Sequence, residues 1–352
     1  MNKAAVYCAL ASAALFGFST PAAKVLLGSI HPAVLAGLLY CGAGVGVALL
    51  RWIMREAFAR HENREAALGR RDAPWLAAAI LCGGIVGPIL LMVGLTRTDA
   101  ATGSLLLTLE GAATALLAWF IFHEGFDRRI ALGMLCLLAG TVILSWSGAP
   151  TIDNLLGPLA IAGACIAWGL DNNLTRKVSL SDPLQIVQIK GLVAGPINLL
   201  LGLWAGGSLP PLSGLALSAS IGFVGYGVSL VLFVYALRYL GAARTGAYFA
   251  TAPFFGAAAA VLALNEPMTG SLVAAATLMG VGVWLHLTER HEHAHFHETV
   301  THTHSHSHDA HHLHEHADSD PPGEPHLHTH VHSALRHEHP HAPDMHHGHR
   351  HQ

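Results

Sequence analysis

Charged residues are scarce in this sequence of 352 residues: they make up 12% of the chain, against roughly a quarter in an ordinary soluble domain. Hydrophobic residues account for 52%, and the mean hydropathy is +0.46. This composition argues against a soluble enzyme. The five cysteines stand singly and form no C-x-x-C pair, so we interpret them as small core residues rather than as a disulfide framework or a metal site.

The scarcity of charge ends near the C-terminus. Residues 1–287 contain 16 Lys and Arg and 12 Asp and Glu, whereas residues 288–352 contain 3 and 10. Histidine is distributed more unevenly still, because 23 of the 27 histidines follow Leu287. The chain therefore consists of an apolar body and a polar, His-rich tail, and the two parts need separate explanations.

Long apolar runs dominate the body. A hydrocarbon core of about 30 Å requires about 20 mostly apolar helical residues, and ten runs approach that length. They cover residues 4–27, 33–54, 74–95, 100–122, 129–147, 155–175, 183–205, 214–236, 242–264 and 269–287. The first run continues to Leu27 without a persuasive cleavage site, which favours a retained first span over a signal peptide.

Basic residues alternate between successive loops. The loops after the even-numbered spans carry Arg51, Arg55, Arg60, Arg64, Arg70, Arg71, Arg128, Arg129, Arg176, Lys177, Arg238 and Arg244. The other loops contain only Arg97. Since positively charged loops stay in the cytoplasm during insertion, this pattern predicts ten spans in the inner membrane with both termini cytoplasmic.

The body contains an internal repeat. A shift of 142 residues places Ala100-Ala101 on Ala242-Ala243, His123-Glu124 on Asn265-Glu266, and Gly83 on Gly225 without a gap. We therefore predict two repeats, residues 4–147 and 155–287, of five spans each. An odd number of spans inverts the second repeat, and inverted repeats commonly build secondary transporters with a binding site near the midplane.

Short motifs in a fixed order carry a resemblance to a known family. They are Phe16-Gly17 with Lys24, Leu107-Thr108-Leu109-Glu110, His123-Glu124 followed by Gly133 and Gly140, Trp168-Gly169, Pro253 and Asn265-Glu266. Over residues 4–287 the sequence resembles the EamA-type carriers of the drug/metabolite transporter superfamily. The resemblance implies a compact fold of ten helices and the proton- or gradient-driven movement of small metabolites.

Two positions depart from that family pattern. Leu39 stands where the family often has Arg, and Gly111 stands where Pro usually follows the glutamate of the fourth span. The position equivalent to Leu39 in the second repeat is Lys190. The substrate contact made by the first repeat is therefore expected to differ from that of the family.

Two charged side chains lie well inside predicted spans, where each costs about 2.5 to 3.5 kcal/mol unless it faces a cavity or a partner. Glu110 lies near the middle of the fourth span, and we predict that it couples protons; the alternative is a neutral carboxyl group that hydrogen-bonds another helix. Lys190, in the seventh span, is predicted to pair with Glu110 or to hold a substrate carboxylate, against the alternative that it snorkels toward the cytoplasm.

Further polar residues are candidates for substrate binding. Asp171 and Asn172 follow Trp168 near the cytoplasmic end of the sixth span, where they line an inner vestibule or end the helix. Asn198 is a weaker candidate, and Lys24 is also a candidate although its position near the outer end of the first span favours snorkelling.

Glu124 and Glu266 occupy equivalent positions before the last span of each repeat. A carboxylate there can accept hydrogen bonds from free amide groups at a helix start. We therefore predict that both residues are structural helix caps.

The tail alternates histidine with other residues, which leaves too few apolar side chains for a core, so we predict a disordered cytoplasmic segment over residues 288–352. Neutral imidazoles bind Zn²⁺, Ni²⁺, Co²⁺ or Cu²⁺. The predicted metal ligands are His291, His293, His295, His297, His302, His304, His306, His308, His311, His312, His314, His316, His326, His328, His330 and His332. Three roles fit: metal delivery to an exporter, metal sensing, or a solvated pH-responsive tail.

Together these features predict an all-α membrane carrier that exports a small metabolite, such as an amino acid or a related compound, and requires no cofactor. Its expected partners are the lipid bilayer, the substrate and metal ions at the tail, with no nucleic acid; a homodimer is one expected assembly. The first alternative is a transition-metal exporter supplied by the tail. The second is a membrane-embedded enzyme acting on lipid-linked substrates, which would need clustered acids, whereas Asp171 has no second aspartate beside it.

Overall fold

The structure is a computed structural model that describes residues 3–57, 67–122, 128–145, 152–288, 292–297, 300–306, 326–332 and 335–340. Regular structure in the described body is entirely helical. Its helices are α1 (Lys3–Leu26), α2 (Pro32–Ala57), α3 (Ala73–Ala79), the π-helix η1 (Ile80–Val86), α4 (Gly87–Thr96), α5 (Ala100–Leu106), α6 (Leu109–Phe122), α7 (Arg128–Ser145), α8 (Ile152–Arg176), α9 (Pro183–Trp204), α10 (Leu212–Ile221), the π-helix η2 (Gly222–Val228), α11 (Ser229–Phe249), α12 (Ala252–Ala263) and α13 (Gly270–Leu287).

Eight stretches of the described body are long and apolar enough to span a membrane. They correspond to eight of the ten predicted spans. The other two predicted spans, 129–147 and 269–287, fall on the shorter apolar helices Ala131–Leu144 and Gly270–Leu285. The chain is therefore a multi-pass membrane protein, and the count of ten remains a prediction.

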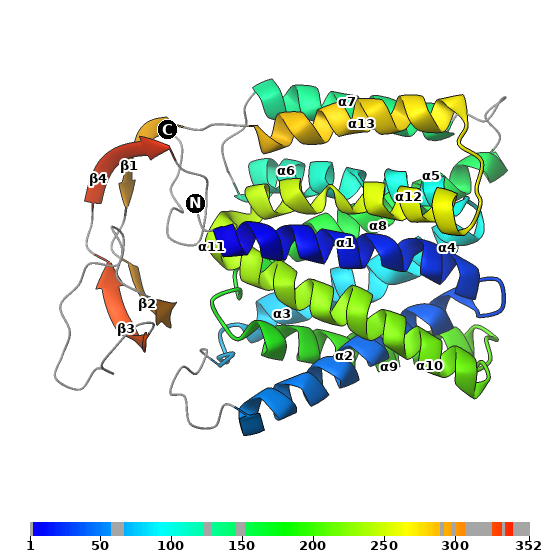
Figure 1. Ribbon diagram of the computed structural model, residues 1–352. Coiled ribbons are helices and arrows are strands. Elements are labelled where there is room, and N and C mark those ends of the chain that lie inside the picture. Colours follow the sequence, from blue (N-terminus) through cyan, green and yellow to red (C-terminus); the bar gives the residue numbers. More distant parts are fainter. Residues whose placement is uncertain are drawn as a thin grey trace.

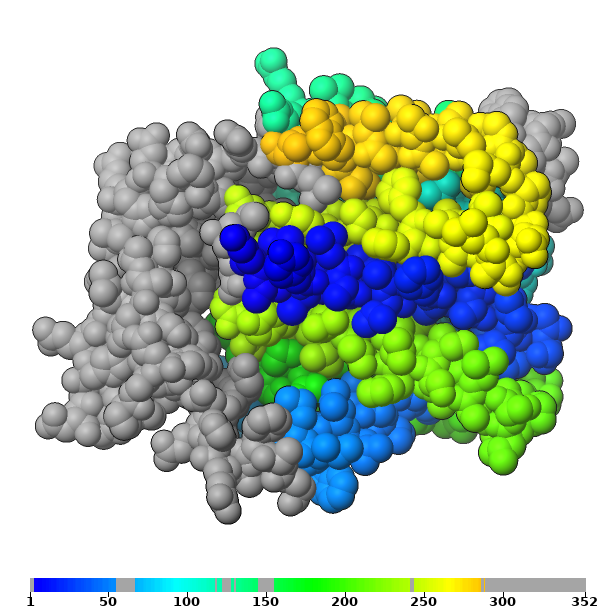
Figure 2. All heavy atoms as spheres, in the orientation of Figure 1, coloured from blue at the N-terminus to red at the C-terminus, as the bar shows by residue number. Residues whose placement is uncertain are grey.

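The helices pack in pairs that join the two halves of the chain. α2 packs along α9, and α7 packs along α13, so that the two pairs form opposite edges of the bundle (Figure 1). Between them, α1 contacts α11 and α12, while α8 contacts α4 and α6. Figure 2 shows α1 in blue on one face of the molecule, with α12 and α13 on one side and α10 and α11 on the other. The first helix of each half thus packs against the third and fourth spans of the other half.

Glycine allows α2 and α9 to approach closely. A Cβ atom on Gly191 would overlap the backbone of Gly44, and a Cβ on Gly44 would lie 2.7 Å from the carbonyl carbon of Gly191. Small residues at helix contacts in membranes permit this backbone approach, which increases van der Waals packing where lipid supplies no hydrophobic driving force. This pair of glycines therefore lies at the interface between the halves.

The third and eighth spans each contain a π-helical turn. η1 and η2 begin at Ile80 and Gly222, which are separated by the same 142 residues as the sequence repeat. The amide of Gly87 bonds to a carbonyl five residues earlier, and so does the amide of Ser229. These wide turns leave carbonyl groups free for other partners within the membrane.

Proline accounts for the wide turn in η1. Pro88 has no amide hydrogen to offer the carbonyl of Gly84, and its ring crowds that carbonyl. The neighbouring Gly83 carbonyl accepts hydrogen bonds from Tyr40 Oη at 2.7 Å and from Trp168 Nε1 at 2.9 Å. Side chains from α2 and α8 thereby satisfy backbone groups that lipid would leave without a partner.

Two predicted continuous spans are interrupted. The fourth span breaks between α5 and α6 at Leu107-Thr108, and the ninth breaks between α11 and α12 at Ala250-Thr251. The predicted spans 100–122 and 242–264 therefore both exist, but each consists of two helical segments. In the ninth span Pro253, two residues after the break, can start a helix but not continue one.

The predicted loop around residues 236–242 is also absent from the described chain, because α11 runs without a break through it. Arg238 lies inside this helix and is 2% exposed. Its guanidinium donates to the carbonyls of Ser179 and Ser181 at 3.1 and 2.9 Å, which fixes the turn between α8 and α9. Arg238, which the loop charges placed outside the spans, is therefore a buried residue that joins α11 to the turn between α8 and α9.

Four strands lie among the described residues of the tail, and the disorder of residues 288–352 as a whole remains a prediction. β1 (Glu292–His297) pairs antiparallel with β4 (Leu335–Pro340), and β2 (Val300–His306) pairs antiparallel with β3 (His326–His332). Alternation of histidine with other residues has the two-residue period of a strand, which accounts for the extended backbone.

Candidate functional site

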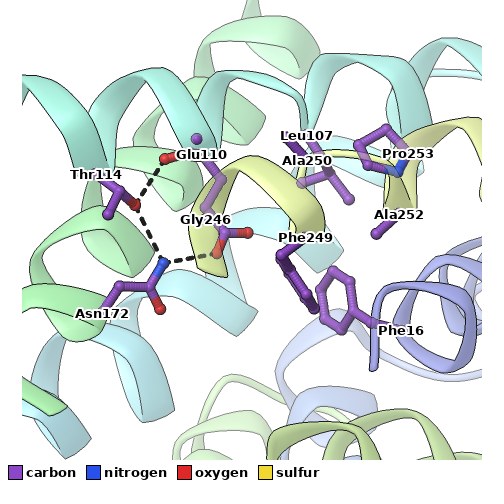
Figure 3. Close-up of a pocket in the computed structure, with 11 residues that line it drawn as sticks. Phe16, Leu107, Glu110, Thr114, Asn172, Gly246, Phe249, Ala250, Ala252 and Pro253 are labelled. Carbon is purple, nitrogen blue, oxygen red and sulfur yellow. Dashed lines mark hydrogen bonds between the residues drawn. The ribbon is translucent and has the colours of Figure 1, made fainter. Parts of the chain in front are cut away.

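Glu110 lies in the first turn of α6, directly after the break in the fourth span. It is 8% exposed, and its Oε1 accepts a hydrogen bond from Asn172 Nδ2 at 2.9 Å. The same amide donates to Thr114 Oγ1 at 3.1 Å, and that hydroxyl donates to the Glu110 carbonyl oxygen at 2.8 Å (Figure 3). A helix start inside the membrane thus places a carboxyl group against the sixth span.

Lys190 pairs with Asp171 rather than with Glu110. Its ammonium lies 2.6 Å from Asp171 Oδ1 and 2.8 Å from Oδ2, and 3.2 Å from Thr175 Oγ1. The Thr175 hydroxyl donates to Asp171 Oδ1 at 2.8 Å. Asp171 and Lys190 are both buried, at 5% and 3% exposure. Two of the predicted substrate-binding residues, one on α8 and one on α9, therefore satisfy each other.

Three neighbouring cavities share this polar centre. The first cavity is lined by Glu110, Asn172, Phe16 and Phe249, together with Pro253 and other residues around the breaks in the fourth and ninth spans (Figure 3). A second cavity adjoins it, and a third reaches Lys190 and Thr175. The second cavity is lined by Phe16, Tyr40, Glu110, Trp168, Asp171, Asn172, Tyr226, Leu230, Phe233 and Phe249. Both halves of the chain therefore contribute walls, as expected for a site between repeats.

Phe16 lies at the centre of the aromatic wall. Its ring is edge-on to Trp168 and to Tyr226, at centroid distances of 5.7 and 5.5 Å, and tilted against Phe249 at 5.3 Å. Figure 3 shows Phe16 and Phe249 side by side between the Glu110 side chain and Ala252. The motif residues Phe16 and Trp168 thus contribute rings to one cluster from opposite halves of the chain.

Four aromatic side chains of this wall were missed by the sequence reasoning: Tyr40, Tyr226, Phe233 and Phe249. One signal in the sequence pointed to an aromatic site. Phe16-Gly17 and Trp168-Gly169 are 152 residues apart, so each repeat has an aromatic residue followed by glycine in its first span. An aromatic residue in an apolar span otherwise looks like any core residue, so its position on a cavity depends on packing.

Asn198 and Lys24 do not line these three cavities. Asn198 Nδ2 donates to the Gly84 carbonyl at 2.8 Å, so the side chain supports η1. Lys24 Nζ donates to the carbonyls of Leu95 and Thr98 at 2.6 and 2.7 Å. Lys24 therefore binds the C-terminal end of α4, where cations complement the helix dipole.

Glu266 accepts hydrogen bonds from the first amides of a helix in the other half. Its Oε1 and Oε2 lie 2.8 and 2.7 Å from the amides of Ala100 and Ala101, at the start of α5. Asn265 has a φ angle of 54°, a left-handed conformation that ends α12 and turns the chain toward α5. Glu266 thus caps α5 rather than its own following helix, and Glu124 lies outside the described residues.

The predicted tail ligands are described in part. His291, His308, His311, His312, His314 and His316 lie outside the described residues, whereas the other ten lie on the strands β1, β2 and β3. The backbone register places His302, His304 and His306 opposite His330, His328 and His326. Among the described residues, no group of three His, Cys, Asp or Glu is placed to hold a metal ion.

Comparison with known proteins agrees with a membrane carrier. The EamA-like transporter family matches residues 3–146 and 155–288. An "Uncharacterized transporter" of Methanothermobacter thermautotrophicus is 29% identical over 283 residues, which cover 77% of this chain and 82% of that protein. A protein of Pseudomonas aeruginosa is 30% identical over 231 residues, covering 65% and 78%.

A solved crystal structure is similar in fold, with a TM-score of 0.61 and 18% identity over 80% of this chain and 94% of that one. The apolar helices and the polar centre between the halves are those of a membrane transporter. The chain belongs to the EamA-like transporter family, whose two matches together cover most of its length.

Proposed function

We propose that this chain is a secondary active carrier of the inner membrane that exports a small polar or amphipathic metabolite in exchange for protons, with both termini in the cytoplasm. The observation that carries the proposal is the position of Glu110. This carboxyl group is buried at a helix break, within a membrane span, beside cavities walled by both halves of the chain.

The surroundings of Glu110 favour a role that changes its charge. An ionised carboxylate in a low-dielectric environment requires a counterion or several hydrogen bonds. Asn172 supplies one hydrogen bond from a neutral amide, and Lys190 is held by Asp171. A proton or a bound substrate can therefore complete the partners of Glu110, which is the property a coupling residue needs.

The broken spans support alternating access. The breaks at Leu107-Thr108 and Ala250-Thr251 lie beside the cavities, and the two π-turns lie in the spans that precede them. Discontinuous helices near the midplane are a common basis for transporter sites, around which one bundle rocks against the other. Here the aromatic cluster around Phe16 joins the halves at that level.

The direct test is a flux assay in proteoliposomes under an imposed pH gradient, using the full chain and a panel of labelled amino acids, amines and related metabolites. We expect gradient-dependent flux from the native chain and its loss in Glu110→Gln. Asp72→Asn is the matched control, because it removes a carboxylate outside the candidate spans. Undiminished gradient-dependent flux in Glu110→Gln would remove Glu110 from proton coupling.

We further propose that the tail binds Zn²⁺, Ni²⁺, Co²⁺ or Cu²⁺. The support is the alternation of histidine and the register of β2 with β3, which places three pairs of histidines opposite one another. Titration of the full chain and of a chain ending at Arg290 tests this directly. Metal binding should fall with truncation, and tail-dependent metal flux would instead favour a transition-metal exporter.

A further inference from the structure

The cavities contain an unequal number of acidic and basic side chains. Among the described residues that line the three cavities, Glu110 and Asp171 are acidic and Lys190 is basic. Lys190 donates to both oxygens of Asp171 and lies beside the hydroxyl of Thr175, so its donors already have partners. Within this lining, Glu110 is the carboxyl group without a cationic partner.

The excess of one acidic side chain in the lining favours a positively charged ligand. A zwitterionic amino acid would need a free cation for its carboxylate as well as an anion for its ammonium, because burying either charge without a partner is costly. Glu110 can receive the ammonium, but Lys190 could receive the carboxylate only by leaving Asp171. The lining therefore complements a single positive charge better than it complements a zwitterion.

The aromatic wall supports the same ligand class. Phe16, Trp168, Tyr226 and Phe249 lie around the second cavity, and the rings of the last three are each 5.3–5.7 Å from that of Phe16. Aromatic faces attract ammonium groups and also bury flat apolar groups.

Tyr226 provides an independent sign of a missing polar contact. Its Oη is buried beside the Ser19 side chain and forms no hydrogen bond of ordinary length and angle, although the Tyr226 side chain lines the second cavity. The neighbouring Tyr40 differs, since its Oη donates to the Gly83 carbonyl. A buried hydroxyl without a partner is unfavourable, and a ligand that supplies a donor or an acceptor would remove that cost.

We propose that the substrate is an organic amine, protonated when it binds, with one apolar or aromatic ring. Its ammonium lies against Glu110, its ring lies in the aromatic wall around Phe16, and its remaining polar group reaches the hydroxyl of Tyr226. This assignment rests on the proposed carrier function and narrows its substrate class to amines rather than amino acids.

The test uses three probes that share a phenyl ring and differ in charge: phenethylamine, phenylalanine and phenylpropionate. Isothermal titration calorimetry of the full chain in detergent at neutral pH measures their binding. We expect the amine to bind at least roughly tenfold more tightly than phenylalanine, a difference of about 1.4 kcal/mol. Equal or tighter binding of phenylalanine or phenylpropionate, or no binding of the amine, overturns the proposal.

Two variants test the named contacts. Glu110→Gln should abolish the preference for the amine, and Tyr226→Phe should weaken amine binding by roughly two- to tenfold, the range of one hydrogen bond. Tyr239→Phe is the matched control, because this tyrosine lies on the same helix but does not line the cavities. Unchanged amine binding in both Glu110→Gln and Tyr226→Phe, each checked for a native elution profile, contradicts the assignment.

A flux measurement in sealed proteoliposomes distinguishes a failure of the amine proposal from a failure of the proposed carrier function. If phenylalanine drives proton movement in sealed proteoliposomes while the amine neither binds nor moves, the carrier stands and the substrate class is wrong. If the amine binds through Glu110 but no flux accompanies it, the binding site stands and the carrier function fails.

Discussion

The ammonium of Lys190 lies 2.6 Å from Asp171 Oδ1, between two adjacent helices within the membrane. Lys190, which the sequence predicted to pair with Glu110 or with a substrate carboxylate, therefore already has a partner. It also holds Asp171 against Gly83, where a Cβ atom would overlap the carboxylate. The pair therefore links the seventh span, the sixth span and the π-turn of the third.

The ion pair should show strong coupling in a double-mutant cycle. Lys190→Met or Asp171→Asn alone should destabilise the protein by about 3–5 kcal/mol, because each leaves a buried group without its partner. The combined variant should cost less than the sum of the two, since neither charge then remains. Thermal unfolding in detergent measures the stability of the native chain, of each single variant and of the combined variant. Additive losses would show that the two residues act independently.

The glycine at position 83 should tolerate no side chain. Gly83→Ala would place a methyl group on the Asp171 carboxylate and force α8 away from η1. We expect a marked loss of folded protein, by about 1–3 kcal/mol, as for other overpacked sites. Gly270→Ala is the control, because nothing lies within 4 Å of its added Cβ. Equal yields and melting temperatures for the two variants would contradict the close approach.

Glu266 should stabilise the start of α5 from the other half of the chain. Glu266→Ala removes two charge-assisted hydrogen bonds to Ala100 and Ala101, and should cost about 1–3 kcal/mol. Glu266→Gln retains one acceptor oxygen and should cost less. The measurement is the shift in melting temperature of each variant, and an unshifted Glu266→Ala would argue against a capping role.

The orientation in the membrane can be tested by cysteine labelling in a background without the five native cysteines. Arg70→Cys, in the loop after α2, should be shielded from a membrane-impermeant maleimide in intact cells. Ser208→Cys, between α9 and α10, should react. Labelling of Arg70→Cys from outside, or shielding of Ser208→Cys, would reverse the predicted topology.

Several helix boundaries could be predicted from local signals. The predicted span 183–205 closely matches α9, because Asp182 caps the helix and Pro183 starts it. The predicted span 33–54 likewise lies within α2. Where apolar length and helix-start residues agree, the sequence is sufficient to place an element.

The interior of the spans could not be predicted in the same way. The break at Leu107-Thr108 has no proline or glycine within it, so its position depends on the contacts that surround it. The partner of Lys190 is likewise decided by how α8 and α9 each pack on η1, which no periodicity encodes. Glu110 could be identified because a carboxyl group within a span is rare; the aromatic wall around it could not, because aromatic residues in spans are common.

The most direct test of the account asks whether substrate and proton share Glu110. Phenethylamine, added to the full chain in detergent with little buffer, should release protons that a pH-sensitive dye detects. Glu110→Gln should release none, whereas Asp72→Asn should release as many as the native chain. Proton release of native size from Glu110→Gln, or none from the native chain, would contradict the assignment of Glu110 as the shared site.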